Sequence, residues 1–310
     1  MRQKIVNGAV ALLMMALFMG IIVMVVLDKR NEAEQQTAKD SEYRQSQQSG
    51  QQENHTLINA SGDTLESRIL VPEGYERTQE PDDSLGAFLR NYAMLPDQTP
   101  VHLYDGEERK HASAAAVFDM YLGDRNLQQC ADSVMRIYAE YLRTIGREDK
   151  IAFHFVDGFL CDWESYKNGK RVKFVDDVPT WKESEVPENL DKAFEDYLNI
   201  VFAYSSTLSQ VDESDAIPLD EIQIGDIFIK GGSPGHVILV ADMCEKDGEK
   251  AFLLAQGFMP AQQFHVLKNL QHEDDPWYYE DEITYPFVTP DYQFDEECLK
   301  RPRYLSDNWP

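Results

Sequence analysis

Basic residues are scarce in this chain. Its 310 residues include 29 lysines and arginines against 55 aspartates and glutamates, which gives a formal net charge of −26 at pH 7. This acidity argues against nucleic acid or an anionic lipid surface as the main partner, because both are polyanions. The negative mean hydropathy excludes a polytopic membrane protein, and the chain has no internal repeat.

Cysteine is also sparse, with four residues at wide spacings. No Cys-x-x-Cys pair occurs, which argues against a zinc knuckle. No group of His, Asp and Glu residues has the spacing of metal ligands, so we expect neither a metal nor a cofactor. Four cysteines in an exported protein could form two disulfides in three ways. If Cys130 is a free thiol, the pairing among Cys161, Cys244 and Cys298 remains open.

Long hydrophobic runs are absent except at the N-terminus. Residues 9–27, AVALLMMALFMGIIVMVVL, carry no charge and are long enough to cross a bilayer as a helix. No small-x-small cleavage site follows, so we expect residues 1–30 to be a membrane anchor rather than a cleaved signal. Basic residues flank both ends of the segment and do not give its orientation. Residues 31–65 are polar and rich in Gln, Glu and Ser, which predicts a disordered linker.

The remaining chain, residues 66–310, has the composition of a folded domain. Helical spacing of apolar residues predicts a helix that begins at Cys130 in CADSVMRIYAEYLRTIG, with Gly146 as its stop. A second long helix is expected in ENLDKAFEDYLNIVFAYSSTL. Three short strands follow, in DEIQIGDIFIK, GHVILVAD and KAFLLAQGF. Helices followed by consecutive short strands predict an α+β fold with an antiparallel sheet.

Cys130 stands at the first turn of its predicted helix. Unpaired backbone N–H groups and the helix dipole stabilise a thiolate there, which makes the position suitable for a nucleophile. The carboxylate of Asp132 would act in the opposite direction if it pointed at the sulfur. The alternative interpretation is a buried cysteine that serves as a small apolar side chain.

His236 begins a strand directly after a glycine-rich loop. A thiol nucleophile needs an imidazole as base, and the imidazole needs a group that orients it. The next strand, residues 251–258, forms a hairpin with the first. If CEKDG is a five-residue loop, Gln256 faces His236, and its amide oxygen could accept the imidazole N–H. A slip of one residue would turn Gln256 away, and His265 and Asp242 are the next candidates.

Several of these residues resemble those of NlpC-type cell-wall endopeptidases and their papain-like relatives. In those enzymes a Gly-Asp pair opens one strand and a histidine begins the next, which are Gly225, Asp226 and His236 here. Their helix-opening nucleophile resembles QCADSVM and corresponds to Cys130. A third polar residue lies on the following strand, at the position of Gln256. The resemblance implies a papain-like fold in which the helix bearing the cysteine packs on the antiparallel sheet.

The sequence departs from the NlpC pattern at two places. Gln129-Cys130-Ala131 replaces the usual Asp-Cys-Ser or Asp-Cys-Gly, and an insertion at about residues 147–220 separates the cysteine from the histidine. The stretches VPEGYER, QQCADSVMRIYAEYL, IKGGSPGHVILVAD and LLAQGFMPAQQFHVLKN are closer to a bacterial envelope family, domain of unknown function 4846. That family label implies no activity.

The functional prediction follows from the wider papain-like resemblance. We expect an envelope cysteine hydrolase that cleaves an amide bond, in a peptidoglycan stem peptide or another envelope molecule, with Cys130, His236 and Gln256 as its catalytic residues. The folded domain would lie outside the cytoplasm, anchored to the membrane through residues 1–30. The alternative is an inactive papain-like module that binds cell-wall or protein ligands.

Overall fold

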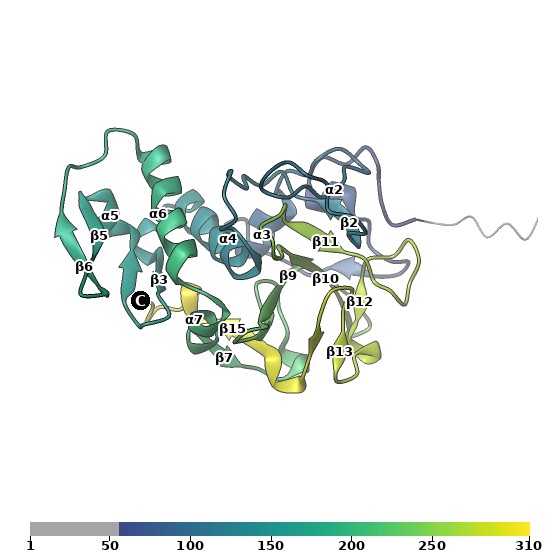
Figure 1. The fold of residues 1–310 in the computed structure, drawn as a ribbon. Helices are drawn as coiled ribbons and strands as arrows, with labels where there is room; N and C mark the ends of the chain where they lie inside the picture. Colours follow the sequence, from purple (N-terminus) through teal and green to yellow (C-terminus); the bar gives the residue numbers. More distant parts are fainter. Residues whose placement is uncertain (1–55) are drawn as a thin grey trace, which may run out of the picture. The chain divides into compact units, whose positions relative to one another are not determined.

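An antiparallel sheet organises the computed structural model, which describes residues 56–310. Its strand order is β2-β11-β10-β9-β8-β15-β7, and β1 and β12 add to β9 and β10 respectively (Figure 1). The bounds are β1 Glu76–Arg77, β2 Ala114–Val117, β7 Ser214–Ala216, β8 Ile227–Lys230, β9 His236–Lys246, β10 Glu249–Gln256, β11 His265–Leu267, β12 Tyr278–Tyr279 and β15 Leu299–Pro302. The predicted α+β class with an antiparallel sheet is confirmed.

Two helices pack directly against β9, the longest strand of the sheet. They are α3 (Leu85–Arg90), capped by the hydroxyl of Ser84, and α4 (Cys130–Thr144). The apolar face of α4 is buried because residues such as Val134 and Ile137 recur at helical spacing. The predicted start of this helix at Cys130 is confirmed. Its cysteine-bearing end therefore lies against the sheet.

Residues between α4 and β8 form a separate group of elements beside α4, seen in teal and green in Figure 1. The buried guanidinium of Arg136 links α4 to this group, because it donates to Glu195 on α6 at 2.7 and 2.9 Å. The elements are η1 Glu148–Lys150, β3 Ala152–His154, β4 Leu160–Asp162, α5 Trp163–Lys167, β5 Lys170–Val175, β6 Val178–Glu183, α6 Leu190–Tyr204, α7 Thr207–Asp212 and η2 Leu219–Glu221. They correspond to the expected insertion, and β7 returns the chain to the sheet.

The C-terminal segment, for which the sequence shows no clear period, crosses back over the sheet in short pieces. Its elements are η3 Glu280–Glu282, β13 Phe287–Val288, β14 Gln293–Phe294, η4 Glu296–Cys298 and η5 Arg303–Leu305. β13 and β14 pair as a hairpin. Phe294 on β14 and Phe287 on β13 pack against Phe228 of β8 with their rings tilted by 49°, so this hairpin covers one face of the sheet.

The hairpin of β9 and β10 differs in detail from the one expected. Its loop has two residues, Asp247 and Gly248, with φ of 52° and 93°. Both are left-handed, as a tight turn between twisted strands requires, and glycine adopts this conformation without strain. The predicted five-residue loop is therefore wrong, because the strands continue pairing through Lys246 and Glu249.

A β-bulge compensates for the shorter loop. Asp242 pairs with Leu253, but Val240 pairs with Leu254, so Ala241 is the extra residue on β9. Side chains alternate between the two faces of a sheet. One extra residue on β9 therefore reverses which residues of β10 share a face with the part of β9 that precedes Ala241. The bulge thus sets the register of the whole beginning of β9 against the end of β10.

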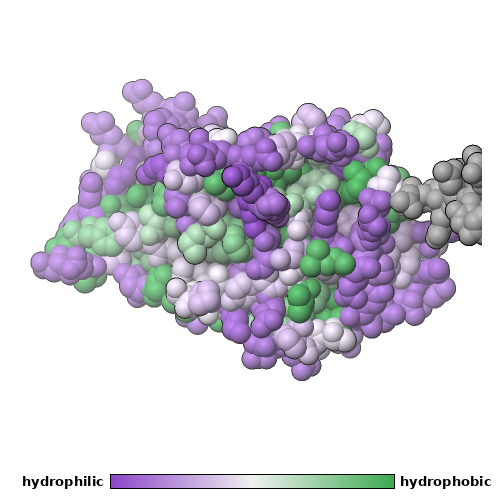
Figure 2. Space-filling view, turned by 45° about the vertical axis from the view of Figure 1, so that its right-hand side comes forward, coloured by the Kyte–Doolittle hydropathy of each residue, from purple (hydrophilic) through white to green (hydrophobic). Residues whose placement is uncertain are grey.

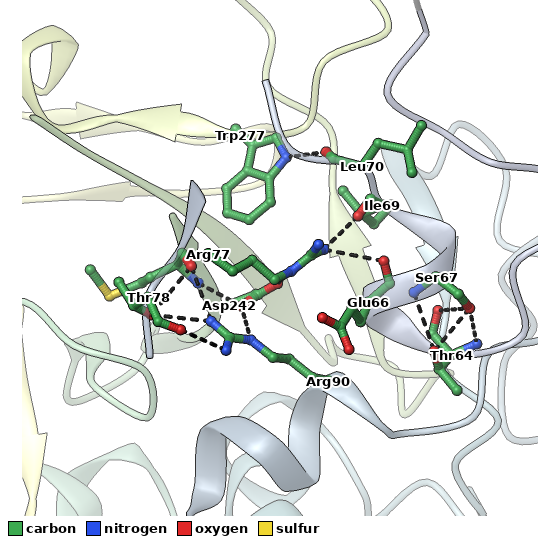
Figure 3. Close-up of polar contacts among 11 residues, drawn as sticks. Thr64, Glu66, Ser67, Ile69, Leu70, Arg77, Thr78, Arg90, Asp242 and Trp277 are labelled. Carbon is green, nitrogen blue, oxygen red and sulfur yellow. Dashed lines mark hydrogen bonds and ion pairs between the residues drawn. The ribbon is translucent and has the colours of Figure 1, made fainter. Parts of the chain in front are cut away.

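Asp242 holds the N-terminal elements onto the sheet (Figure 3). Its fully buried carboxylate accepts from Arg77 Nε and Arg90 Nε, both at 2.7 Å. Arg90 also donates to the carbonyl oxygen of Thr78, which ties α3 to the residue after β1. Both carboxylate oxygens of Asp242 thus bind arginines, so Asp242 is not the group that orients His236.

Helix α2 (Leu65–Arg68) and the residues before it belong to the folded unit. The buried side chain of Arg68 donates to the carbonyl oxygen of Gly62, and the backbone N–H of Leu57 donates to Asp274. Residues 56–65, expected to be linker, are therefore packed against the domain. The predicted anchor, residues 1–30, and residues 31–55 of the predicted linker lie outside the described residues.

The outer surface is largely polar. Figure 2 shows a face on which hydrophilic residues predominate and hydrophobic residues form small separate groups. This pattern agrees with the excess of acidic residues in the chain. Within residues 56–310, no helix is long and apolar enough to cross a membrane.

Candidate active site

The thiol of Cys130 lies at the first residue of α4. The helix begins there because the backbone N–H of Gln129 donates to the carboxylate of Asp132 at 2.9 Å, and the Ser133 hydroxyl donates to the carbonyl oxygen of Gln129 at 2.8 Å. The backbone N–H groups of a first helical turn have no partner within the helix. Cys130 itself is only partly buried, and the backbone N–H groups of Cys130 and Ala131 lower the pKa of its thiol.

Gly257 allows the start of α4 to approach the end of β10. A Cβ atom at this residue would collide with Ser133 Oγ and would lie 2.8 Å from the carbonyl oxygen of Gln129. Any larger residue would push the helix away from the strand. The thiol also lies near β9, where the backbone N–H of Val237 lowers the pKa of Cys130. Cys130 therefore lies near the residue next to His236, although no hydrogen bond joins the sulfur to the imidazole within residues 56–310.

His236 is the first residue of β9 and is 1% exposed. Its ring packs among three aromatic rings, with centroid distances of 4.8 Å to Phe258, 5.2 Å to Tyr292 and 6.1 Å to Phe294. Tyr292 also donates its hydroxyl to the carbonyl oxygen of Pro234 at 3.1 Å. The imidazole is thus covered by the β13–β14 hairpin and by the residues after β10.

Gln256 binds the imidazole as the sequence predicts, with its Oε1 2.7 Å from His236 Nε2. The register is different from the expected one. Ala255 pairs with Leu239, and one further residue along this register places Gln256 opposite Ile238. His236 is two residues from Ile238 and therefore on the same face, at the diagonal position across the two strands. Without the bulge at Ala241, Gln256 would stand opposite Leu239 and point to the other face.

Two residues that the sequence analysis missed complete the arrangement. Gln256 Nε2 donates to Asp291 at 2.6 Å, and Asp291 accepts from Arg109 at 2.5 Å. His265, an alternative candidate in the sequence, is the cross-strand partner of Gln256 on β11, and its Nε2 lies 3.4 Å from Gln256 Nε2. No periodicity marks Arg109 or Asp291, because both lie in irregular segments far from Gln256 in the chain.

Burial dominates the electrostatics of the site. It raises the pKa of the Cys130 thiol to about 11, and the charge of Asp132 acts in the same direction. It lowers the pKa of His236 to about 4, against the opposing effect of the Gln256 hydrogen bond. It also raises the pKa of Asp132 to about 8. Thiol and imidazole are therefore both uncharged at neutral pH.

The other cysteines and histidines lie away from this arrangement. Cys161, Cys244 and Cys298 are buried, and all four cysteines are free thiols. His154 contacts the carboxylate of Glu213 at 2.9 Å. No group of three or more His, Cys, Asp or Glu side chains within residues 56–310 is placed to hold a metal ion.

The sequence places the chain in a family without an assigned activity. The family model described as Domain of unknown function (4846) matches residues 65–301, and the chain belongs to that family. No curated protein and no solved structure matches the chain.

Proposed function

We propose that this protein is a cysteine hydrolase with a papain-like fold of the NlpC type. The observation that supports this proposal is the contact between His236 Nε2 and the amide oxygen of Gln256, on two adjacent strands, beside a helix that begins with Cys130. A nucleophile at a helix start, a base on a strand and an orienting amide on the next strand are the parts that thiol hydrolysis requires. In this assignment Cys130, His236 and Gln256 are the catalytic residues.

The two nitrogens of the imidazole have different roles in the reaction. Nε2 is engaged by Gln256, so Nδ1 is the nitrogen that takes the proton of the Cys130 thiol as the sulfur attacks the substrate carbonyl. Backbone N–H groups at the start of α4 stabilise the oxyanion. The protonated His236 then gives its proton to the leaving amine, and a thioester to Cys130 remains. Water, activated by the neutral imidazole, hydrolyses this thioester and regenerates the thiol.

The resting state of this mechanism is a neutral thiol beside a neutral imidazole. Burial raises the pKa of Cys130 and lowers that of His236, so a thiolate–imidazolium pair does not form in the closed site. Proton transfer therefore accompanies attack, and His236 acts as a general base. A substrate must displace some of the aromatic rings that cover His236. Tyr292 and Phe258 are the outer rings, because both are only partly buried.

The substrate we propose is an amide bond in a peptidoglycan stem peptide. Support comes from the resemblance of the Cys130 and His236 segments to cell-wall endopeptidases, and from the uncharged segment of residues 9–27. On this basis we propose that the domain lies in the bacterial cell envelope, anchored through residues 1–30. The strongly acidic composition agrees with a substrate other than nucleic acid.

A second candidate function has one observation in its favour. His236 is 1% exposed and the pKa of Cys130 is raised, as expected for an inactive papain-like module that binds cell-wall or protein ligands. In such a module the imidazole would pack in the core and would have no effect on the thiol. The two functions therefore differ in whether His236 controls the reactivity of Cys130.

Alkylation of Cys130 in the full-length chain separates the two functions. The rate of labelling by iodoacetamide at pH 8 is measured for the wild type, for His236→Ala and for His272→Ala. Within residues 56–310, the one side chain that forms a hydrogen bond with His272 is that of Glu282, so its variant is the matched control. A hydrolase predicts slower labelling in His236→Ala alone. Equal rates in all three proteins favour the inactive module.

A further inference from the structure

We propose that Asp291 is a positioning residue that fixes the orientation of the Gln256 amide and thereby selects the tautomer of His236. This inference rests on the proposed function, because the tautomer matters only if His236 acts as a base. Asp291 is not adjacent to any catalytic residue in the sequence. It lies in the turn between β13 and β14, where Thr289 donates both its N–H and its hydroxyl to the carbonyl oxygen of Tyr292.

The chemistry of the donors and acceptors determines how the Gln256 amide is turned. An ionised carboxylate only accepts hydrogen bonds, and a guanidinium only donates them. Asp291 accepts from Arg109 Nη2 through one oxygen, which leaves its other oxygen facing Gln256 at 2.6 Å. The atom of Gln256 that faces this oxygen must be the amide nitrogen. The carbonyl end of the same amide must then face His236.

His265 provides a second and independent reason for this orientation. Its Nδ1 lies 3.0 Å from the carbonyl oxygen of Gln263, which can only accept, so Nδ1 carries the proton. Burial lowers the pKa of His265 to about 4, so the ring is neutral and its Nε2 has a free lone pair. That lone pair faces the amide nitrogen of Gln256 at 3.4 Å. Both hydrogens of the amide nitrogen therefore have acceptors.

The orientation of the amide decides which nitrogen of His236 is the base. Because Oε1 of Gln256 accepts at 2.7 Å, His236 Nε2 must carry the proton. Nδ1 then has the lone pair that can remove the thiol proton of Cys130. If the amide were reversed, its nitrogen would donate to Nε2, the proton would lie on Nδ1, and the ring could not accept a proton on that side.

Arg109 holds Asp291 in this role. Its guanidinium carbon lies 4.8 Å from the ring centroid of Phe258, which is itself in contact with His236. The side chain is mostly buried at 17% exposure, and that of Asp291 at 16%. The pair bridges two irregular segments and is largely shielded from water, and Arg109 Nη1 is buried without a hydrogen-bond partner within residues 56–310. The pair anchors the amide of Gln256 from the side opposite His236.

The test is the position of the proton on His236, read from the ¹⁵N chemical shifts of its ring in the full-length chain. The His236 signals are assigned by their loss in His236→Gln. In the wild type we expect a protonated Nε2 and an unprotonated Nδ1. In Asp291→Ala we expect shifts averaged between the two tautomers, and alkylation of Cys130 slower by roughly tenfold, the order typical of partners that orient a functional imidazole. Asp291→Asn should lose the wild-type shifts as Asp291→Ala does, because its single amide oxygen cannot accept from both Arg109 and Gln256.

Asp295→Ala is the matched control, since Asp295 follows the same hairpin but pairs with Lys230 at the surface. It should leave the shifts of His236 unchanged. Should Asp291→Ala fail to fold, Arg109→Gln gives the same readout, because the carboxylate loses its anchor. A proton on Nδ1 in the wild type, or wild-type shifts in the folded Asp291→Ala and Arg109→Gln variants, would overturn the inference.

The outcomes also separate this inference from the proposed function. If the wild type hydrolyses no amide but Asp291→Ala alters the tautomer of His236, the positioning role stands and the hydrolase proposal fails. If the wild type is a hydrolase and the tautomer does not respond to Asp291, only the positioning role fails.

Discussion

The side chain of Gln256 reaches His236 Nε2 at 2.7 Å although the two residues are diagonal rather than opposite across β9 and β10. The bulge at Ala241 creates this relationship, because it moves Gln256 to the face on which the imidazole lies. A bulge beside a candidate active site is a common way to aim a side chain. The contact therefore depends on a backbone feature that lies five residues from His236 in the chain.

Substitution of Gln256 tests what this contact contributes. Gln256→Ala should reduce turnover by about 10-fold to 1000-fold, on the order of 1.4–4 kcal/mol in the barrier, with little change in substrate affinity. The reason is geometric, since the amide holds a tautomer and supplies no charge. Gln256→Asn should keep part of the rate. Steady-state kinetics on a peptidoglycan peptide give the measurement, and a Gln256→Ala enzyme with wild-type kcat would remove Gln256 from the mechanism.

The pH dependence of Cys130 alkylation tests the neutral resting state. The pKa of the thiol is raised to about 11 by burial, so the thiolate fraction increases with pH throughout the range from 6 to 9. The rate of labelling by iodoacetamide should therefore increase over this whole range. The labelled residue is identified by peptide mapping. A rate that is constant above pH 6 would instead indicate a preformed thiolate–imidazolium pair, and the resting state described above would be wrong.

Much of the arrangement could be predicted from local sequence. The start of α4 at Cys130 follows from apolar periodicity, and His236 at the beginning of a strand follows from the glycine-rich loop before it. The tight hairpin turn also had a signal, because Asp247-Gly248 is the dipeptide that two-residue turns favour. The sequence analysis expected a five-residue loop instead. The two-residue turn alone would place Gln256 on the face opposite His236, and the extra residue at Ala241 returns it to the same face.

Other features depend on tertiary contacts that no local pattern encodes. Arg109 and Asp291 are 182 residues apart in sequence and meet only after the β13–β14 hairpin folds over the sheet. Residues 56–65 look like linker by composition, but a buried Arg68 that needs the carbonyl oxygen of Gly62 draws them into the domain. The polar linker pattern is thus overridden by tertiary contacts, which include this hydrogen bond and the one from the N–H of Leu57 to the carbonyl oxygen of Asp274.

Asp242 should be among the most important residues for stability. Asp242→Ala would leave Arg77 and Arg90 without their shared buried carboxylate, and it should lower the free energy of unfolding by about 3–5 kcal/mol. Asp295→Ala, which breaks an ion pair at the surface, should cost about 0–1 kcal/mol. Chemical denaturation of the two variants gives the comparison. Equal stability of the two would mean that the arginines find other partners.

In the proposed hydrolase the Cys130 thiol cleaves an amide bond with His236 as its base. The decisive experiment measures the release of new amines from purified peptidoglycan by the full-length protein, by Cys130→Ser and by Cys298→Ser. Cys298 is a buried free thiol outside the site, so its variant controls for loss of a sulfur. We expect amine release by the wild type and by Cys298→Ser, and none above background by Cys130→Ser. If the wild type releases amines no faster than Cys130→Ser does, Cys130 is not the nucleophile of an amide hydrolase.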